Sequence, residues 1–291
     1  MPEVCEVIIM CHYLISNIGN NKIRKIIEDN KVKKLNYPLT VTNIDTKGKF
    51  LWFELTDSKG KELYILNTFG LVGKWICDKD VEKYEIVMEL DKKKIYFVDK
   101  MKLGLFEITN NKDKLIEKIQ KLAPDFLKTS YTNDEFIKIF RLFLSKHKRK
   151  MEMPIVKLLM SQNIKDGIGS GLGNYLTPEI LYHSKISPHR QLQDLTDFDL
   201  MKLNEKIQFV TKWCYLHNTS DYTKDILDYL DQHYKQIKNK MFPMFHPTIN
   251  IPKTPFIFEV YQKKKDSLGN IILVDNIIGN RKTYWTNAVQ K

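Results

Sequence analysis

Apolar residues near the N-terminus of the chain recur three or four positions apart, which predicts a helix over residues 3–18. These apolar residues are Val4, Val7, Ile8, Cys11, Leu14, Ile15 and Ile18. Pro2 comes just ahead, where a helix tolerates a residue without an N–H. Glu3 and Glu6 are three residues apart and therefore share one side of the first turn.

From about residue 31 to residue 109 the pattern changes to a period of two. Runs rich in aromatic and β-branched residues predict strands at 49–55, 62–66, 84–90, 95–98 and 105–108. Turn residues separate them at Ser58-Lys59-Gly60, Asp78-Lys79-Asp80 and 91–94. Short, evenly spaced strands of this kind predict an antiparallel sandwich or barrel.

The helical period returns after Lys112, and a break at Ala123-Pro124-Asp125 predicts a linker. Residues 132–135 form a capping box, Thr-Asn-Asp-Glu, ahead of an apolar stripe. Further helices are predicted near 154–164, 174–183, 197–216 and 221–238. The segment 242–255 holds four prolines and should be extended, and the tail predicts a hairpin with strands 256–261 and 271–274 and a turn at 267–270.

The chain is strongly basic, with 47 Lys and Arg against 35 Asp and Glu, a net charge of +12 and a pI near 9.2. Such a surface attracts polyanions, of which nucleic acid is the commonest. The bias towards Lys, Asn and Ile also fits an AT-rich genome, such as that of a large DNA virus. Charge alone therefore leaves both explanations open.

Composition excludes several classes of protein. A chain of 291 residues predicts about two domains, and no stretch reaches the roughly 18–20 apolar residues of a membrane helix. The first fifteen residues are acidic, which is not typical of a signal peptide. The four cysteines form no CxxC pair and the seven histidines no cluster. We therefore expect a nuclear or cytoplasmic protein of a reducing compartment, with free thiols and no metal.

The N-terminus is the first candidate for chemistry. Removal of Met1 would expose the secondary amine of Pro2, and an α-amine with a pKa of about 7.7–8.0 is partly neutral near pH 7. A neutral amine can form a Schiff base with an aldehyde-like carbon, and a neighbouring carboxylic acid can protonate a leaving sugar oxygen. The ordinary alternative is a helix that begins with Pro and carries Glu to complement its dipole.

The second candidate is the glycine-rich run from Gly167 to Asn174. It lacks the Gly-Lys-Ser/Thr of a P-loop, and a predicted helix rather than a strand precedes it, which excludes a nucleotide-binding loop. What remains is a tight turn that leads into a helix, where bare N–H groups bind phosphate and Asn174 adds a donor. A flexible loop is the alternative.

The third candidate is the basic and aromatic tail from Gly279 to Trp285. On a hairpin turn, Arg281 could hold a phosphate through two parallel hydrogen bonds. A solvated basic tail is the alternative.

In this order, the three candidates make the chain resemble the formamidopyrimidine-DNA glycosylase / endonuclease VIII family over essentially its whole length. Residues 1–6 are similar to the family's Met-Pro-Glu-x-x-Glu opening, and residues 48–55 to its Lys-bearing strand. Residues 69–73 resemble its Gly-Met-Ser-Gly turn, residues 162–181 its helix–two-turn–helix, and residues 281–290 the end of its C-terminal finger.

The resemblance implies a bifunctional DNA glycosylase and abasic-site lyase of base excision repair. Pro2 would attack C1′ of the damaged nucleotide, and the Schiff base would permit β,δ-elimination. Glu3 would be the general acid/base on the deoxyribose, Glu6 would hold that geometry, and Lys49 would contact the phosphate beside the lesion.

The implied partner is double-stranded DNA with oxidised bases or abasic sites. Asn174 and Arg281 would hold phosphates on either side so that the nucleotide flips out. Lys157 and Thr283 are further expected DNA contacts, and Leu71 is an expected apolar wedge. We expect no cofactor, and a monomer that does not associate with membranes.

Three features depart from the family pattern. The finger usually has four cysteines that bind zinc, but Thr286 and Val289 match the last pair and no Cys follows Cys214. The hairpin is therefore expected to be a zincless finger, as in one eukaryote-type branch of endonuclease VIII-like enzymes. The wedge positions, which are Met, Arg and Phe in the formamidopyrimidine branch, match Leu71, Met101 and Leu103. Residues 167–170 resemble an insertion.

We accordingly expect an α+β fold. An N-terminal helix and antiparallel β-sandwich would form a catalytic domain (1–122), followed by a helix–two-turn–helix domain (131–246) and a zincless β-hairpin finger (247–291). The Pro-rich segment 243–255 lacks the Gly-rich lid of the branch that prefers 8-oxoguanine. This absence favours oxidised pyrimidines, and ring-opened or further-oxidised purines, as substrates.

Two other functions remain open. One is a non-catalytic nucleic-acid binder that shares the helix–two-turn–helix, as a small-subunit ribosomal protein does, and the other is an inactive lesion-binding member. Neither needs Pro2, Glu3, Glu6 and Lys49 together, so their joint presence favours the enzyme.

Overall fold

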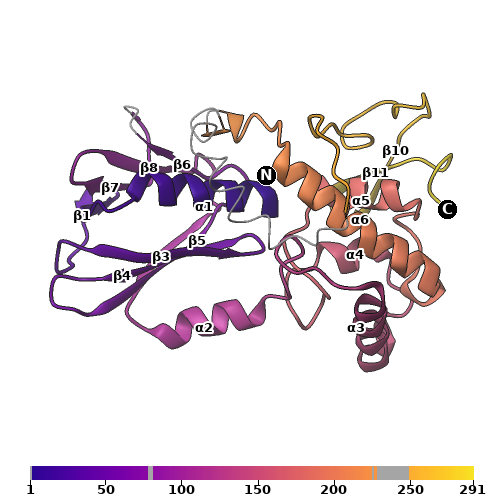
Figure 1. Ribbon diagram of the computed structural model, residues 1–291, viewed down its shortest axis with the longest axis horizontal. Helices are drawn as coiled ribbons and strands as arrows, with labels where there is room; N and C mark the ends of the chain where they lie inside the picture. The colour runs from indigo at the N-terminus through magenta and orange to yellow at the C-terminus, as the bar shows by residue number, and fades with distance from the viewer. Residues whose placement is uncertain (1, 78–80, 225, 228–248) are drawn as a thin grey trace. The chain divides into compact units, whose positions relative to one another are not determined.

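The computed structural model describes residues 2–77, 81–224, 226–227 and 249–291 (Figure 1). It divides into two compact units. The first comprises Met1–Pro2, Glu6–Gln120 and Asp221–Lys238, and the second comprises Glu3–Cys5, Lys121–Ser220 and Asn239–Lys291. One of the boundaries between them, from Cys5 to Glu6, falls in the first turn of helix α1 (Val4–Ile18).

Helix α1 is buried on almost every side. Its side chains from Val4 to Leu14 are all buried, and Ile15 is its one large apolar residue that is substantially exposed, at 45%. A helix that is apolar all round belongs inside a core. The predicted helix over residues 3–18 is therefore confirmed to within one residue.

Two antiparallel sheets make up the rest of the first unit, which confirms the predicted sandwich. The first sheet has the order β2-β1-β7-β8-β6 and the second the order β3-β4-β5-β9. Their strands are β1 (Ile23–Glu28), β2 (Lys31–Val32), β3 (Thr40–Lys47), β4 (Phe50–Thr56), β5 (Glu62–Thr68), β6 (Lys74–Cys77), β7 (Ile86–Leu90), β8 (Lys94–Val98) and β9 (Leu105–Thr109). The aromatic runs correspond to β4, β5, β7, β8 and β9.

Helix α2 (Lys112–Lys121) follows β9 and lies beside the four-stranded sheet (Figure 1). It supports the turn between β3 and β4. The Nζ of Lys47 donates to the carbonyl of Ile119 at 3.0 Å, and the ammonium of Lys118 lies 5.9 Å from the centre of the Phe50 ring. Helix α2 therefore contacts the residue on each side of the turn formed by Gly48 and Lys49.

Four α-helices and two short 3₁₀ turns form the described helical part of the second unit. They are α3 (Asn133–Lys146), η1 (Lys148–Lys150), α4 (Ile155–Met160), α5 (Leu176–Ser184), η2 (Leu192–Asp194) and α6 (Asp197–Leu216). The predicted capping box is confirmed, because the Thr132 side chain accepts from the N–H of Glu135 and the Glu135 carboxylate accepts from the N–H of Thr132. Among the described helices, none is long and apolar enough to cross a membrane.

The helix predicted over 154–164 is too long. Helix α4 ends at Met160, because Ser161 takes an extended conformation (φ −69°, ψ 137°) and the next carbonyl, that of Gln162, accepts from the N–H of Ala123. The predicted linker around Ala123 is thus paired with the chain after α4. The helix predicted over 221–238 lies mostly outside the described residues.

The predicted C-terminal hairpin has the wrong strands. The observed pair is β10 (Leu273–Ile278) and β11 (Arg281–Trp285), with the turn at Gly279 and Asn280. The segment 256–261 cannot join a ladder because the consecutive N–H groups of residues 259–261 all donate to the carboxylate of Glu179, at 2.8–2.9 Å. Glu179 is fully buried, so this contact decides the course of the chain before the hairpin.

Lys212 of α6 makes stability depend on pH. It is 2% exposed, its Nζ donates to the hydroxyl of Ser130 at 3.4 Å, and burial lowers its pKa to about 8. Between about pH 8 and about pH 10.5 this lysine therefore binds a proton in the unfolded chain but not in the folded one, so its contribution to stability should rise with pH. We expect this rise to be smaller in Lys212→Met. Urea unfolding of both proteins at about pH 8 and about pH 10 tests this, and equal pH dependence would contradict it.

Candidate active site

The carboxylate of Glu3 lies on the N-terminus of α5, within the second unit. It accepts from the N–H of Tyr175 at 2.8 Å and from the N–H of Leu176 at 3.3 Å, and it is fully buried. The positive end of a helix stabilises an anion in this place. The bare N–H groups that the sequence analysis offered to a phosphate are thus bound by Glu3, and that prediction is wrong.

The glycine-rich turn before α5 is fixed by side chains. Gln162 accepts from the N–H of Gly171 at 2.8 Å and donates to the carbonyl of Leu172 at 2.9 Å. The hydroxyl of Ser170, which is fully buried, donates to the carbonyl of Ala123 at 2.8 Å. The flexible-loop alternative does not fit a turn bonded in this way.

Two glycines of this turn let other groups approach closely. Gly171 has a φ of +106°, and its carbonyl accepts from the N–H of Val4 at 3.0 Å. A Cβ on Gly171 would lie 2.6 Å from the Cβ of Val4, and one on Gly169 would lie 2.1 Å from the Phe126 ring. Only glycine fits such contacts, and Gly171 thereby sets the position of the residue after Glu3.

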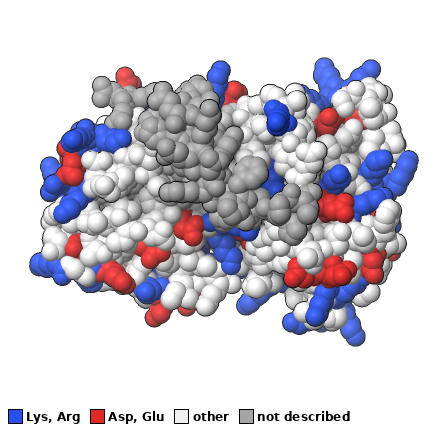
Figure 2. Space-filling model, viewed as in Figure 1, with Lys and Arg blue, Asp and Glu red and all other residues white. Residues whose placement is uncertain are grey.

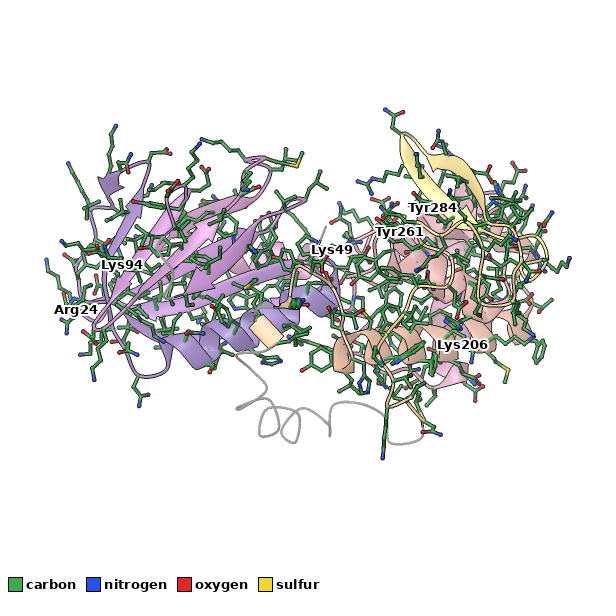
Figure 3. The ribbon with its side chains drawn as sticks, turned by 90° about the horizontal axis from the view of Figure 1, so that it is seen from above. Arg24, Lys49, Lys94, Lys206, Tyr261 and Tyr284 are labelled. Atoms are coloured by element: carbon green, nitrogen blue, oxygen red, sulfur yellow. The ribbon has the colours of Figure 1, made fainter. Side chains whose placement is uncertain are left out.

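Tyr261 is a site residue that the sequence analysis did not single out. The side chain of Asn174 hydrogen-bonds its hydroxyl; burial raises the pKa of Tyr261, that hydrogen bond lowers it, and the charge of Glu3 raises it further. Tyr261 also packs edge-on against Tyr284 of β11, with ring centres 5.3 Å apart (Figure 3). Tyr261 therefore connects the turn before α5 to the hairpin, a link that a lone aromatic in the sequence does not reveal.

In the hairpin, the side chain of Arg281 is exposed and that of Thr283 is buried. Arg281 is exposed and begins β11 directly after the turn. Thr283 is 3% exposed and pairs with Asp275 of β10 in the ladder, so burial of its side chain does not favour the predicted DNA contact. Lys157, the remaining candidate of the second unit, is exposed on α4.

In the first unit, Pro2 and Glu6 are buried, and Glu6 is only 2% exposed. Lys49 is half-buried and lies in the β3–β4 turn rather than within a strand, as the sequence had suggested (Figure 3). The positive φ of Gly48, +58°, is what turns the chain there.

The three predicted wedge positions lie on two loops that pack together. Leu71 is 39% exposed, Met101 is 50% exposed and Leu103 is 54% exposed. A Cβ on Gly70 would lie 2.8 Å from the Cβ of Leu103, so the loops touch. Asp99 fixes the second loop by accepting from the N–H of Met101 at 3.2 Å and from that of Gly104 at 2.6 Å. The structure thus brings these apolar side chains together on the surface.

Tyr222 also supports this surface and was not found from the sequence, where it stood inside a predicted helix. Its hydroxyl donates to the carbonyl of Gly73, which closes the turn that carries Leu71. Burial raises the pKa of Tyr222 well above its ordinary value, and the charges of Glu6 and Asp99 add to this effect.

Charge is spread rather than concentrated on the face shown in Figure 2, where the described Lys and Arg side chains alternate with Asp and Glu. The described residues also contain no group of three His, Cys, Asp or Glu side chains placed to hold a metal ion.

Two family models match the chain. The model of the formamidopyrimidine-DNA glycosylase N-terminal domain covers residues 1–106, and that of the C-terminal domain covers residues 247–291. Together they take in more than half of the sequence. The chain belongs to the formamidopyrimidine-DNA glycosylase family.

Individual relatives are distant. Formamidopyrimidine-DNA glycosylase of Corynebacterium glutamicum is 31% identical over 179 residues, which span 58% of this chain and 57% of that protein, less than two thirds of its length. The enzyme from a Wolbachia of Brugia malayi is 28% identical over 72% of this chain and 76% of its own. The Lactococcus lactis enzyme, solved with DNA containing an abasic site, superposes with a TM-score of 0.71 at 20% identity over 99% of both chains, which shows a shared fold.

In this formamidopyrimidine-DNA glycosylase family member, Gly171→Ala should be much more damaging than Gly269→Ala. Both glycines have a positive φ, +106° and +85°, but an added Cβ meets Val4 only at Gly171 and meets nothing within 4 Å at Gly269. We expect the free energy of unfolding to fall by about 1–2 kcal/mol for Gly269→Ala and by about 3 kcal/mol or more for Gly171→Ala. Denaturant unfolding measures both, and equal losses would show that the contact with Val4 does not matter.

Proposed function

We propose that this chain is a bifunctional DNA glycosylase and abasic-site lyase that acts as a monomer on double-stranded DNA with oxidised bases or abasic sites. The proposal rests on the binding of the Glu3 carboxylate to the first amides of α5. This contact fixes the residue that directly follows Pro2 in the chain. A buried carboxylate fixed by the backbone next to an N-terminal amine is an arrangement suited to Schiff-base chemistry.

In the proposed reaction, the amine of Pro2 forms a bond to C1′ while the bond from C1′ to the damaged base breaks, and the departing base keeps the electron pair of that bond and takes a proton from water. Glu3, whose carboxylate accepts from two backbone N–H groups, takes the proton that the attacking amine loses. It then returns this proton to O4′, the deoxyribose ring opens, and an iminium links Pro2 to the sugar. The iminium acidifies the hydrogen on C2′, and loss of that proton to water expels the 3′-phosphate and leaves a conjugated iminium. Loss of a second proton to water, from C4′ of this conjugated iminium, then expels the 5′-phosphate.

The other candidates would hold the DNA. Lys49, at the β3–β4 turn, and Arg281, at the hairpin turn, would contact phosphates, with Lys157 as a further cation. Asn174 would present its amide to a phosphate from its position beside Tyr261. Glu6 would help to maintain the geometry of the N-terminus.

Glu3→Gln should separate chemistry from binding. Glutamine can accept a hydrogen bond but cannot take and return the proton, so single-turnover cleavage of an abasic duplex should fall about 100-fold or more. Affinity for a duplex with an uncleavable tetrahydrofuran abasic analogue, together with thermal unfolding, serves as the control. A variant that binds and folds normally but cleaves at the wild-type rate would contradict the role of Glu3.

The substrate proposal rests on two features of the sequence. One is the apolar residues at the three expected wedge positions, and the other is the absence of a Gly-rich stretch from the Pro-rich segment 243–255. Leu71, Met101 and Leu103 supply exposed apolar surface but no arginine to distinguish the opposite base. We expect a thymine glycol duplex to be processed at least about tenfold faster than an 8-oxoguanine duplex, a difference of about 1.4 kcal/mol in the barrier. Parallel single-turnover assays test this, and faster release of 8-oxoguanine would reverse the assignment while leaving the mechanism in place.

A further inference from the structure

The C-terminal hairpin has apolar support mainly on β11, where Tyr284 packs against a buried cluster of Tyr182, Val260 and Ile272, and has less on β10. Leu273 is 36% exposed and Val274 is 47% exposed, and the pairing of β10 with β11 shifts register between Asp275 and Ile278. An isolated two-stranded hairpin is at best marginally stable in water. Something outside the two strands must therefore determine how the turn before Arg281 is held.

Asp275 connects both strands of the hairpin to a third segment. It pairs with Thr283 in the ladder, so Trp285 is its diagonal neighbour on the same face. One oxygen of Asp275, Oδ2, accepts from the indole N–H of Trp285 at 2.6 Å and from Nε2 of His189 at 2.8 Å. His189 comes from the loop after α5, and its ring meets that of Trp285 edge-on at 5.1 Å.

The end of the chain is bound to the same loop. The side chain of Gln290 accepts from the N–H of Thr286 at 2.9 Å and donates to the carbonyl of Ile186 at 3.0 Å. The N–H of Ser187 donates to the carbonyl of Lys291 at 2.9 Å. These bonds fix the chain just after the end of β11. The cluster of His189, Asp275 and Trp285 joins both strands of the hairpin to the loop after α5.

We propose that the cluster of His189, Asp275 and Trp285 positions the hairpin so that Arg281 is presented to a DNA phosphate. This inference rests on the proposed function, because it takes Arg281 as a phosphate contact. An ordinary surface ion pair contributes little. This one differs because a single carboxylate oxygen joins two strands to the loop after α5 through two short hydrogen bonds, in a hairpin that contains no cysteine.

The test measures affinity for the tetrahydrofuran duplex and single-turnover cleavage of an abasic duplex. We expect Asp275→Ala and His189→Ala to weaken binding about five- to tenfold while cleavage at saturating protein stays within about twofold. His189→Gln should restore binding, since its amide N–H can donate to Asp275. Asp197→Asn is the matched control, because it removes an exposed ion pair with Arg141, at 2.7 Å, elsewhere in the same unit.

A double-mutant cycle shows whether Asp275 acts through Arg281. If it does, Asp275→Ala combined with Arg281→Ala should bind no more weakly than Arg281→Ala alone. Additive losses, unchanged binding in Asp275→Ala, or unchanged binding in Arg281→Ala would each overturn the inference.

Hydrogen exchange separates this inference from the proposed function. Amides of β10 and β11 should exchange faster in Asp275→Ala and His189→Ala, but not in His189→Gln or Asp197→Asn. Absence of cleavage by the wild-type protein would defeat the proposed function and leave this structural result standing. Unchanged exchange in both alanine variants would overturn the cluster's role, whatever the enzyme does.

Discussion

The contact between the Glu3 carboxylate and the first amides of α5 is the interaction on which the candidate site depends. It uses the positive end of a helix to hold a fully buried acid, and it fixes the residue next to Pro2. The surrounding turn is built to allow this: Gln162 ties down the backbone, and Gly171 leaves room for Val4. A larger residue at Gly171 would disturb the site without touching a catalytic group.

Carboxylates bound to backbone amides also fix two other loops of the chain. Glu179 collects three N–H groups and so places Tyr261, and Asp99 collects two and so holds the loop of Met101 and Leu103. Charge-assisted bonds of this kind are strong and directional, which makes irregular loops as well defined as helices. Acidic residues of the chain thus organise the loops that carry Tyr261, Met101 and Leu103.

Local sequence patterns predicted the elements whose stability is local. The apolar spacing located α1, the range of α6 and five strands, and the capping box located the start of α3. The patterns failed where a distant side chain decided the structure. The segment 256–261 has the sequence pattern of a strand, but its backbone course is set by hydrogen bonds to Glu179, 80 residues away. The N-terminus of α5 is bound by the carboxylate of Glu3, 172 residues away. Tyr261 and Tyr222 were missed because single tyrosines carry no periodic signal.

The most direct test of the account is to locate the covalent bond. Borohydride reduction of the protein with an abasic duplex, followed by proteolysis and mass spectrometry, identifies the residue that carries the sugar. We expect the adduct on the N-terminal peptide, at the nitrogen of Pro2 with Met1 removed. An adduct on a lysine such as Lys49, or no adduct in a protein whose Pro2 amine is free, would contradict it.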